Sequence, residues 1–417
     1  MATEEDSSSS NLPNDIVQVI LSRLPVKPLL RFKTVSKSWN TMISDIAFIR
    51  MHLQQSEHSD THNRFLHTHR LVNPRSLDKH ISFVDRYMLG NPRNREIVFS
   101  LARVESRKFQ YEEKLEYPRG WEDVLCTCQG VTLLSNYSYE TYMLWNPSTR
   151  TESMFSFPYK FDQKYKNRFE SYPVKYGLCH DPTIDDFKVV ITSEQCYAVY
   201  SCKNKSWTNI KKFGYITCRM DISYRMDSGM DSDSGIFVDG AIYWVGMIDG
   251  YYRYNREIIY FDPRDDDFKI LQKPPKNVKE SEEFSLICLR GCLCLYYYSI
   301  TSDYTMDDTM DGIVDDTMDT YKIWIKEKGR DKNSWNKLMT IENVEPTTVW
   351  FTPLCLLENN TILIRLDTRL VVYSPCTKTF EEFDEENPLS EVRLFPCLQS
   401  LLSPLENFRP KRNRLRT

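Results

Sequence analysis

Glycine is scarce in this sequence, with 13 residues among 417. A phosphate-binding loop needs several glycines close together, because the backbone must approach the ligand. The sequence contains no such loop, and it also lacks a Gly-x-Ser-x-Gly turn, an HExxH helix and the protein-kinase motifs. The sequence therefore gives no support to a nucleotide-dependent or hydrolytic enzyme.

Histidine is also rare, with seven residues, of which four lie close together. These four are His58, His62, His67 and His69. Their spacing would allow two imidazoles on one helical face as metal ligands, but the segment is polar and we interpret it as a linker. The carboxylates of Asp185 and Asp186 fall in a predicted turn, where short acidic side chains bond to their own backbone. We therefore expect no metal and no cofactor.

Long apolar runs and an excess of basic charge are missing as well. No apolar stretch approaches the length of a membrane span, and the start MATEEDSSSS lacks the features of a secretory signal. The net charge is -4, which is untypical of a general nucleic-acid binder. We expect neither a membrane nor a nucleic acid as partner. The expected location is the cytoplasm, with the nucleus as a second option because the last nine residues are strongly basic.

The twelve cysteines are interpreted in the light of that location. Without a secretory signal we expect reduced thiols that are buried as small apolar side chains. Cys126 with Cys128, and Cys292 with Cys294, form C-x-C pairs. Neither has a second pair at the spacing of a zinc site, so they do not predict a metal centre.

The N-terminal region shows helical periodicity over residues 11 to 53. A first helix carries Ile16 on its apolar face and ends at Pro25. Pro28 can occupy the first turn of a second helix, and a short third helix follows near residues 43 to 48. The sequence therefore predicts a three-helix unit.

This unit is too small to bury a good core alone, yet its apolar residues extend around more than one face. The surplus apolar surface can pack on the rest of the chain or on another protein, and a polar rim around an apolar patch is typical of the second case. Residues 12 to 53 contain six basic and two acidic residues, a net charge of +4. A basic rim would attract an acidic partner.

After about residue 65 the helical pattern gives way to short runs of β-branched and aromatic residues. One pattern recurs along this region. It consists of an apolar run with an aromatic residue, a polar turn and a second short run. The copies are residues 142–155, 196–210, 258–271, 321–338 and 370–383. Their spacing of roughly 50 to 60 residues is close to that of a kelch blade. The pattern predicts a β-propeller and leaves the number of blades open.

Other signals add detail to the predicted β domain. Residues 176–190 form a related hairpin, and turns with Asp-Gly in 235–246 and Arg-Gly in 285–299 each predict a hairpin. We expect five tryptophans to form core between blades. They are Trp145, Trp207, Trp244, Trp324 and Trp335.

Specificity is expected in the loops of the β domain, because loops lie at the surface. The candidate loops are residues 156–175, 211–234 and 300–320. Two acidic segments with a repeated Met-Asp unit, 223–235 and 302–320, are either expanded surface loops or an arm for a basic partner.

The stretch LPNDIVQVILSRLPVKPLLRFKTVSKSW, residues 12 to 39, resembles the plant type of F-box at nearly every motif position. Pro28 stands where that motif usually has serine. Segments such as LWNPSTR, VYSCKNKSW and LVVYSPCTKTFEEF resemble the plant F-box-associated domain in the order of that family, over most of residues 80 to 390. That family includes the S-locus F-box proteins of pollen self-incompatibility.

The resemblance implies a non-catalytic substrate receptor of an SCF-type ubiquitin ligase. The F-box would bind a Skp-type adaptor, and through it the cullin and RING subunits, while the β domain would capture a protein substrate, of which an S-ribonuclease is one candidate. The adaptor-binding residues that the resemblance implies are Leu12, Pro13, Ile16, Ile20, Leu21, Leu24, Pro25, Leu29, Val35 and Trp39. The alternative is a β-propeller that binds proteins or glycans without a ligase, and whose helical start packs on its own propeller.

The expected fold is mainly β with a small α domain, in which a three-helix F-box precedes a β-propeller-like, kelch-like domain. The expected organisation is a disordered tail (1–10), the F-box (11–53), a linker with the start of the β domain (54–80), the F-box-associated propeller-like domain (81–390) and a C-terminal segment with a basic tail (391–417).

Overall fold

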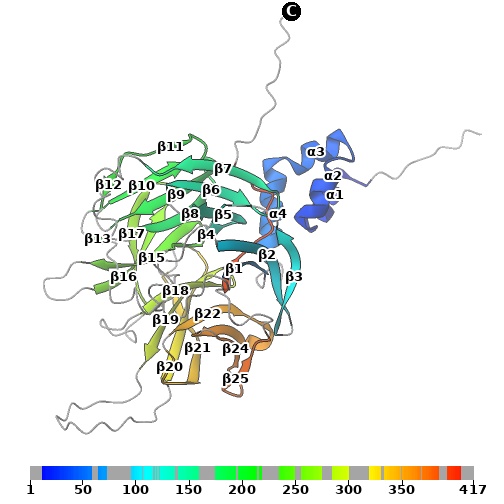
Figure 1. The fold of residues 1–417 in the computed structure, drawn as a ribbon. Helices are drawn as coiled ribbons and strands as arrows, with labels where there is room; N and C mark the ends of the chain where they lie inside the picture. Colours follow the sequence, from blue (N-terminus) through cyan, green and yellow to red (C-terminus); the bar gives the residue numbers. More distant parts are fainter. Residues whose placement is uncertain are drawn as a thin grey trace, which may run out of the picture.

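The computed structural model describes residues 12 to 404 of the chain with several gaps. The gaps are residues 59–63, 73–94, 106, 116–117, 119, 122, 137–139, 159–173, 194–195, 214–215, 218–233, 249–254, 275–283, 300–318, 330–332, 349, 368 and 385–391. The described elements form four N-terminal helices followed by strands in six antiparallel sheets. Figure 1 shows these sheets as the blades of a propeller, with the helices at one edge. The predicted class, mainly β with a small helical domain, is confirmed.

The N-terminal unit has four helices, whereas the sequence analysis led us to expect three. They are α1 (Asn14–Ser22), α2 (Val26–Phe32), α3 (Lys37–Ile43) and α4 (Ile46–His58). The difference arises from two caps. The Ser36 hydroxyl accepts a hydrogen bond from the Trp39 N–H and starts α3, while the Asp45 carboxylate accepts one from the Ala47 N–H and starts α4. The apolar periodicity of the sequence does not reveal either cap, and the expected third helix, near residues 43 to 48, spans the boundary between α3 and α4.

We number the blades in chain order. Blade 1 consists of β26 (Val392–Pro396), β1 (Arg64–Val72), β2 (Arg95–Glu105) and β3 (Lys108–Leu115). Blade 2 consists of β4 (Asp123–Cys128), β5 (Val131–Ser135), β6 (Thr141–Asn146) and β7 (Thr151–Ser156). Blade 3 consists of β8 (Lys175–Asp181), β9 (Asp186–Thr192), β10 (Cys196–Ser201), β11 (Ser206–Trp207) and β12 (Lys211–Lys212).

The remaining blades follow the same order. Blade 4 consists of β13 (Ile216–Thr217), β14 (Ile236–Val238), β15 (Ala241–Ile248), β16 (Asn255–Asp262) and β17 (Asp267–Leu271). Blade 5 consists of β18 (Phe284–Leu289), β19 (Cys292–Ser299), β20 (Asp319–Lys326) and β21 (Trp335–Val344). Blade 6 consists of β22 (Phe351–Leu356), β23 (Ile362–Leu366), β24 (Arg369–Ser374) and β25 (Thr379–Glu382), with the 3-10 turn η6 (Glu358–Asn360) after β22.

The repeated hairpins of the sequence have a common position in the fold. In blade 4, β13 and β14 both pair with β15, and we count them together as its first strand. With this count, each copy supplies the third and fourth strands of one blade, in blades 2 to 6. The two glycine turns join the first and second strands of blades 4 and 5. Both central residues of each turn have positive φ, 49° and 73° at Asp239-Gly240 and 49° and 69° at Arg290-Gly291, which matches the tight turns of two-residue hairpins.

Blade 1 closes the ring, because it combines strands from both ends of the β domain. β26 pairs antiparallel with β1, and Pro396 lies opposite Phe65. This pairing joins the two ends of the β domain in one sheet, and the radial repetition of blades leaves only short strand edges. The sequence pattern did not reveal blade 1, because its first strand lies more than 300 positions after its second.

Tryptophan side chains fill the spaces between blades. Trp145, Trp244, Trp324 and Trp335 are buried in apolar clusters between neighbouring blades. Trp207 is only partly buried, yet it also bridges two blades, since its indole N–H donates to the Ser156 carbonyl at 2.8 Å. The cysteines of the described residues form no disulfide, and burial raises the pKa of thiols such as Cys355 to about 12.

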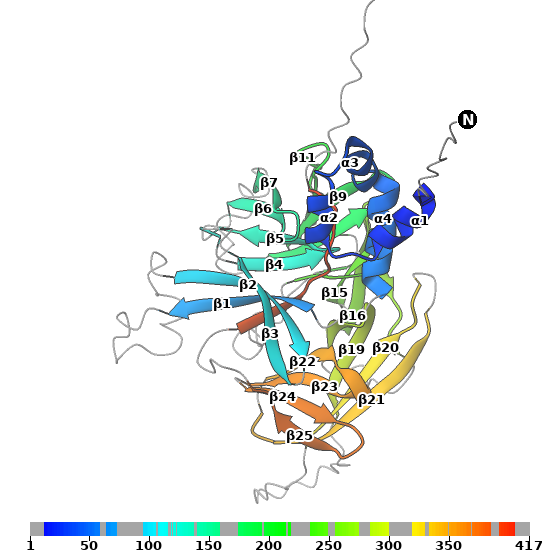
Figure 2. The same ribbon diagram turned by 90° about the vertical axis from the view of Figure 1, so that its right-hand side faces the viewer.

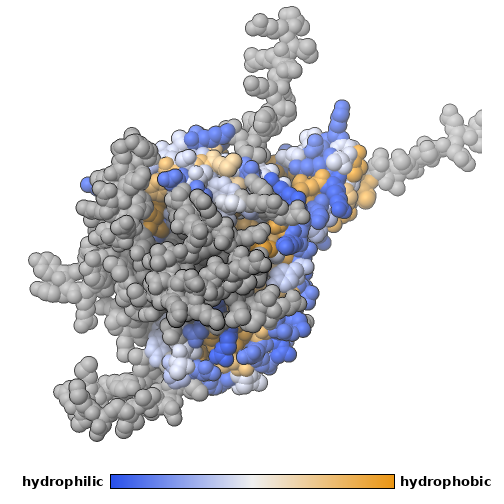
Figure 3. Space-filling view, in the orientation of Figure 1, coloured by the Kyte–Doolittle hydropathy of each residue, from blue (hydrophilic) through white to orange (hydrophobic). Residues whose placement is uncertain are grey.

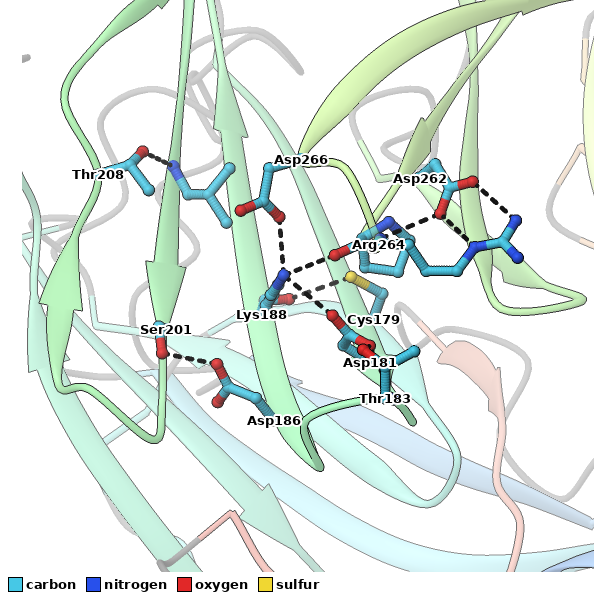
Figure 4. A network of polar contacts seen from close by, with 12 residues as sticks. Cys179, Asp181, Thr183, Asp186, Lys188, Ser201, Thr208, Asp262, Arg264 and Asp266 are labelled. Atoms are coloured by element: carbon cyan, nitrogen blue, oxygen red, sulfur yellow. Dashed lines mark hydrogen bonds and ion pairs between the residues drawn. The ribbon is translucent and has the colours of Figure 1, made fainter.

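A buried lysine links blades 3 and 4 (Figure 4). The Lys188 ammonium donates to the Asp181 carboxylate at 3.1 Å, to the Asp266 carboxylate at 2.8 Å and to the Pro263 carbonyl at 2.6 Å. Burial by itself would lower the pKa of Lys188, but the hydrogen bonds with Asp266 and Asp181 outweigh it and the pKa is raised. The charged form therefore fastens two turns of adjacent blades.

The first prediction concerns this lysine. Replacement of Lys188 with methionine leaves the buried Asp181 carboxylate without its cation, so we expect a loss of about 3 kcal/mol in the free energy of unfolding. The matched control is Lys269→Met, which removes an exposed ion pair with Asp265 and a 3.5 Å contact with Asp262. Asp262 keeps its ion pair with Arg264, so the expected cost is under about 1 kcal/mol. Urea unfolding of both variants measures the difference, and equal losses would contradict the prediction.

Candidate functional site

The two ends of the propeller differ in how the strands are joined. At one end, which we call the turn face, short turns join the first to the second strand in blades 2 to 6 and the third to the fourth strand in all six blades. At the other end, which we call the loop face, the second strand leads to the third, and each blade leads to the next. The helices pack on the turn face of blades 2 and 3, and Figure 2 shows α2 and α4 beside their strands.

One side of the helical unit forms a continuous core with the propeller. Leu21, Val26, Leu29 and Ile43 are buried in the same apolar cluster as side chains of blades 2 and 3. Polar contacts add to this junction. The Arg50 guanidinium donates to the Pro182 carbonyl at 3.1 Å, in the turn between β8 and β9. The chain therefore covers much of the apolar surface of its helices itself.

A second apolar face of the unit remains in solvent. Leu12, Ile16, Val19 and Ile20 are 59%, 47%, 46% and 50% exposed, and we call these four residues the α1 patch. Val19 and Ile20 follow Ile16 by three and four positions, which places these three on one side of α1, and Leu12 lies two residues before the helix. Val35 after α2 is also exposed, so the first helices hold five of the ten large exposed apolar side chains among the described residues. Figure 3 shows this apolar surface beside polar atoms of the helices.

The structure separates the expected adaptor-binding residues into three groups. The exposed residues are Leu12, Pro13, Ile16, Ile20, Pro25 and Val35. The half-buried residues are Leu24 and Trp39, and the buried ones are Leu21 and Leu29. Leu21 and Leu29 supply core to the junction with the propeller and leave no surface for a partner. Val19 was absent from the expected set, although its position three residues after Ile16 places it on the same stripe.

Trp39 holds α3 against α2. Its ring meets the ring of Phe32 edge-on, with centroids 5.5 Å apart and planes at 84°. This T-shaped arrangement is one of the favourable geometries for aromatic pairs. Trp39 therefore stabilises the unit that displays the α1 patch.

Basic residues around the helices have two different roles. Lys27 lies 3.6 Å from the Glu113 carboxylate of β3, and Arg50 bonds to the propeller backbone, so both join the helices to the β domain. Arg23, Arg31 and Lys37 are exposed and form a basic rim on the helical unit. Such charges increase the rate of encounter with an acidic partner more than the final affinity.

A buried histidine supports the corner between α1 and α2. His52 of α4 is 2% exposed, and its Nε2 lies 3.0 Å from the Leu24 carbonyl oxygen, to which an Nε2–H donates. Its Nδ1 has no hydrogen-bond partner among the residues that the structure describes. Burial lowers the pKa of His52, against the opposing effect of the Leu24 hydrogen bond. The neutral ring is therefore the stable form in the folded unit.

Of the four histidines that lie close together in the sequence, His67 is the one whose side chain the structure describes. His62 lies outside the described residues, and His67 is buried in β1 between the rings of Phe109 and Tyr111. Within the described ranges, no group of three or more His, Cys, Asp or Glu residues has the arrangement of a metal site. A search of the same ranges finds no helix with the length and apolarity needed to cross a bilayer.

The candidate specificity loops 156–175, 211–234 and 300–320 lie largely outside the described residues. The strands that flank them are described. β7 leads to β8, β12 leads to β13 and β14, and β19 leads to β20, all at the loop face. The ends of these strands therefore point away from the face that carries the helices.

Comparisons with known proteins agree with this architecture. The F-box domain model matches residues 9–51, and the F-box associated beta propeller domain model matches residues 103–392. A helical F-box joined to a propeller defines a class of F-box proteins. This chain belongs to the family with the F-box associated β-propeller domain, whose architecture implies a substrate-adaptor role in SCF ubiquitin ligases. F-box proteins of this kind are typically non-catalytic.

Individual relatives come from Arabidopsis thaliana. F-box/kelch-repeat protein At3g23880 is 24% identical over 409 residues, which cover 96% of this chain and 98% of the relative. F-box protein At3g07870 is 24% identical over 402 residues, which cover 89% and 87%. F-box protein At2g14710 is 52% identical over 42 residues, or 10% of this chain and 12% of the relative.

The second prediction follows from the environment of His52. Its pKa lies below the ordinary value of 6.5, so the unfolded chain binds a proton more readily than the folded chain. The contribution of the neutral His52 ring to the free energy of unfolding is fully present above pH 6.5. It is lost as the pH falls through the lowered pKa. We expect His52→Gln, whose amide can still donate to the Leu24 carbonyl, to show a weaker loss of stability between neutral and mildly acidic pH. Denaturant unfolding across this range tests it, and parallel pH profiles of the two proteins would refute it.

Proposed function

We propose that this chain is the substrate-recognition subunit of an SCF-type ubiquitin ligase. The α1 patch and the adjacent corner at Leu24 and Pro25 bind a Skp-type adaptor, which connects the chain to cullin and RING subunits. The propeller binds a protein substrate through its loop face. The chain acts in the cytoplasm or the nucleus, and an S-ribonuclease is the candidate substrate to test first.

The helical unit has one apolar side that is buried and another that is exposed, and this observation carries the proposal. One side packs into the core of the propeller, while the α1 patch stays in solvent on the other side. Contiguous exposed apolar side chains with a polar rim are typical of interaction sites. Because about half of each such side chain is already covered, its burial in an interface contributes roughly 1 kcal/mol, half of the value for full burial.

The positions of the two faces support the same function. The helices occupy the turn face, and the strands that flank the candidate specificity loops end at the loop face. An adaptor and a substrate can therefore bind together without competing for surface. Holding the substrate near the ubiquitin-bearing subunit raises its effective concentration, which is the contribution expected of a non-catalytic receptor.

The alternative, a propeller that acts without a ligase, is favoured by one observation. The helices do pack on their own propeller, as that function requires. It gives no reason, however, for an apolar stripe in solvent along α1. The ligase function accounts for both faces of the unit, and we therefore prefer it.

The third prediction tests adaptor binding. In Ile16→Ser/Ile20→Ser, two half-exposed apolar side chains are lost from the α1 patch, and the fold should be retained because neither belongs to the buried core. We expect binding to a purified plant Skp-type adaptor to weaken at least about 10-fold, since the exposed halves of two aliphatic side chains are lost from the interface. Isothermal titration calorimetry measures the affinity.

Ile270→Ser is the matched control for that experiment. Ile270 is 38% exposed on β17, the last strand of blade 4, whereas the helices pack on blades 2 and 3. The control should bind the adaptor like the parent chain. Unchanged affinity of the double variant, with its circular dichroism intact, would exclude the α1 patch as the adaptor site.

A further inference from the structure

After β26 closes the propeller, the chain continues under the helices. We call residues 397 to 404 the C-terminal segment. Ser400, Leu401 and Leu402 are buried, and the two leucines belong to the cluster that joins the helices to blades 2 and 3. Figure 2 shows this segment, in red, running from β26 towards α2. The segment therefore lies between the propeller and the helical unit.

Blade 2 fixes the path of this segment through an asparagine. The Asn146 side-chain amide donates to the Ser400 carbonyl at 2.9 Å and to the Leu402 carbonyl at 2.7 Å. Its own oxygen accepts from the Ser148 and Thr149 N–H groups in the turn after β6. Asn146 is fully buried, and both its donors and its acceptor are used. The amide thus ties the C-terminal segment to a rigid turn.

Close packing at Gly130 gives a second constraint. A Cβ atom at this position would lie 2.6 Å from both the Leu398 carbonyl oxygen and the Ser400 Cβ. Only glycine allows the segment to approach the turn between β4 and β5 so closely. Two blade 2 elements therefore hold the segment in one place.

The segment in turn completes the start of α2. The Gln399 side-chain oxygen accepts a hydrogen bond from the Val26 N–H at 3.2 Å, across 373 positions of sequence. The residue before α2 is Pro25, and it provides no side-chain cap. Free N–H groups at a helix start need an acceptor, and most helices find it in the residue just before them. Here the acceptor comes from the other end of the chain.

We propose that the C-terminal segment is a positioning element for adaptor binding, with Gln399 as its central residue. It sets the orientation of α2 and of the corner at Leu24 and Pro25 beside the α1 patch. This inference rests on the proposed function, because the corner is the surface that the adaptor would contact. Gln399 acts through α2 and does not itself touch the partner.

The first test of this inference needs no adaptor. A chain that ends after Pro396 keeps β26 but lacks the C-terminal segment, and a chain that ends after Pro404 is its control. We expect hydrogen exchange of amides in α2 and α4 to accelerate in the shorter chain, while β1 and β26 stay protected. The control should match the full chain. Equal protection of α2 in all three chains would overturn the proposal.

The second test uses point variants that keep the segment. Gln399→Met keeps the length of the side chain but removes the acceptor, whereas Gln399→Glu keeps an acceptor oxygen. We expect Gln399→Met to weaken adaptor binding by about 2- to 12-fold and to speed exchange in α2 by a similar factor, as for one lost hydrogen bond. Gln399→Glu should retain both properties.

The outcomes separate this inference from the proposed function. If the full chain fails to bind the adaptor, the proposed function fails, and the exchange data still decide whether the segment positions α2. If the full chain binds and Gln399→Met binds equally well, the positioning role is excluded while the ligase function stands. Equal losses in Gln399→Met and Gln399→Glu would also overturn the role of the acceptor.

Discussion

The pairing of β26 with β1 is the interaction on which the rest of the molecule depends. Because the two strands are antiparallel, the start of β1 and the end of β26 lie at the same point of the turn face, with Phe65 opposite Pro396. The helices that precede β1 and the segment that follows β26 therefore leave the propeller side by side. Closure of the ring and the position of the C-terminal segment beside the start of β1 both follow from this one geometry.

Neighbouring residues of the helical unit serve different purposes, since some stabilise the fold and others remain exposed for recognition. Ile20 is half-exposed, whereas the next residue, Leu21, is buried against the propeller. A helix of this size can serve two surfaces because successive side chains point in different directions, about 100° apart. The propeller supplies the core that the short helices lack, so the outer face of α1 need not be buried for the unit to fold. A small F-box can thus keep a costly apolar stripe in solvent without losing its fold.

Much of the architecture could be predicted from local sequence patterns. The F-box stretch, the hairpins of blades 2 to 6 and the tight turn at Asp239 depend on neighbours in sequence, and the structure confirms them. Features that depend on distant residues could not be predicted. Blade 1 needs β26, the burial of Leu29 needs the propeller, and the cap on Val26 needs Gln399. Periodicity identifies an apolar face, but only the tertiary structure decides whether protein or solvent covers it.

The bonding of Asn146 has a consequence for the chemical ageing of the receptor. Asparagine converts slowly to aspartate when the following backbone nitrogen attacks the side-chain amide, and this attack needs an N–H that proline does not have. The residue after Asn146 is Pro147. Conversion would place a carboxylate against the carbonyl oxygens of Ser400 and Leu402, where the amide now donates two hydrogen bonds. The Asn-Pro pair therefore protects the junction between propeller and helices over the lifetime of the protein.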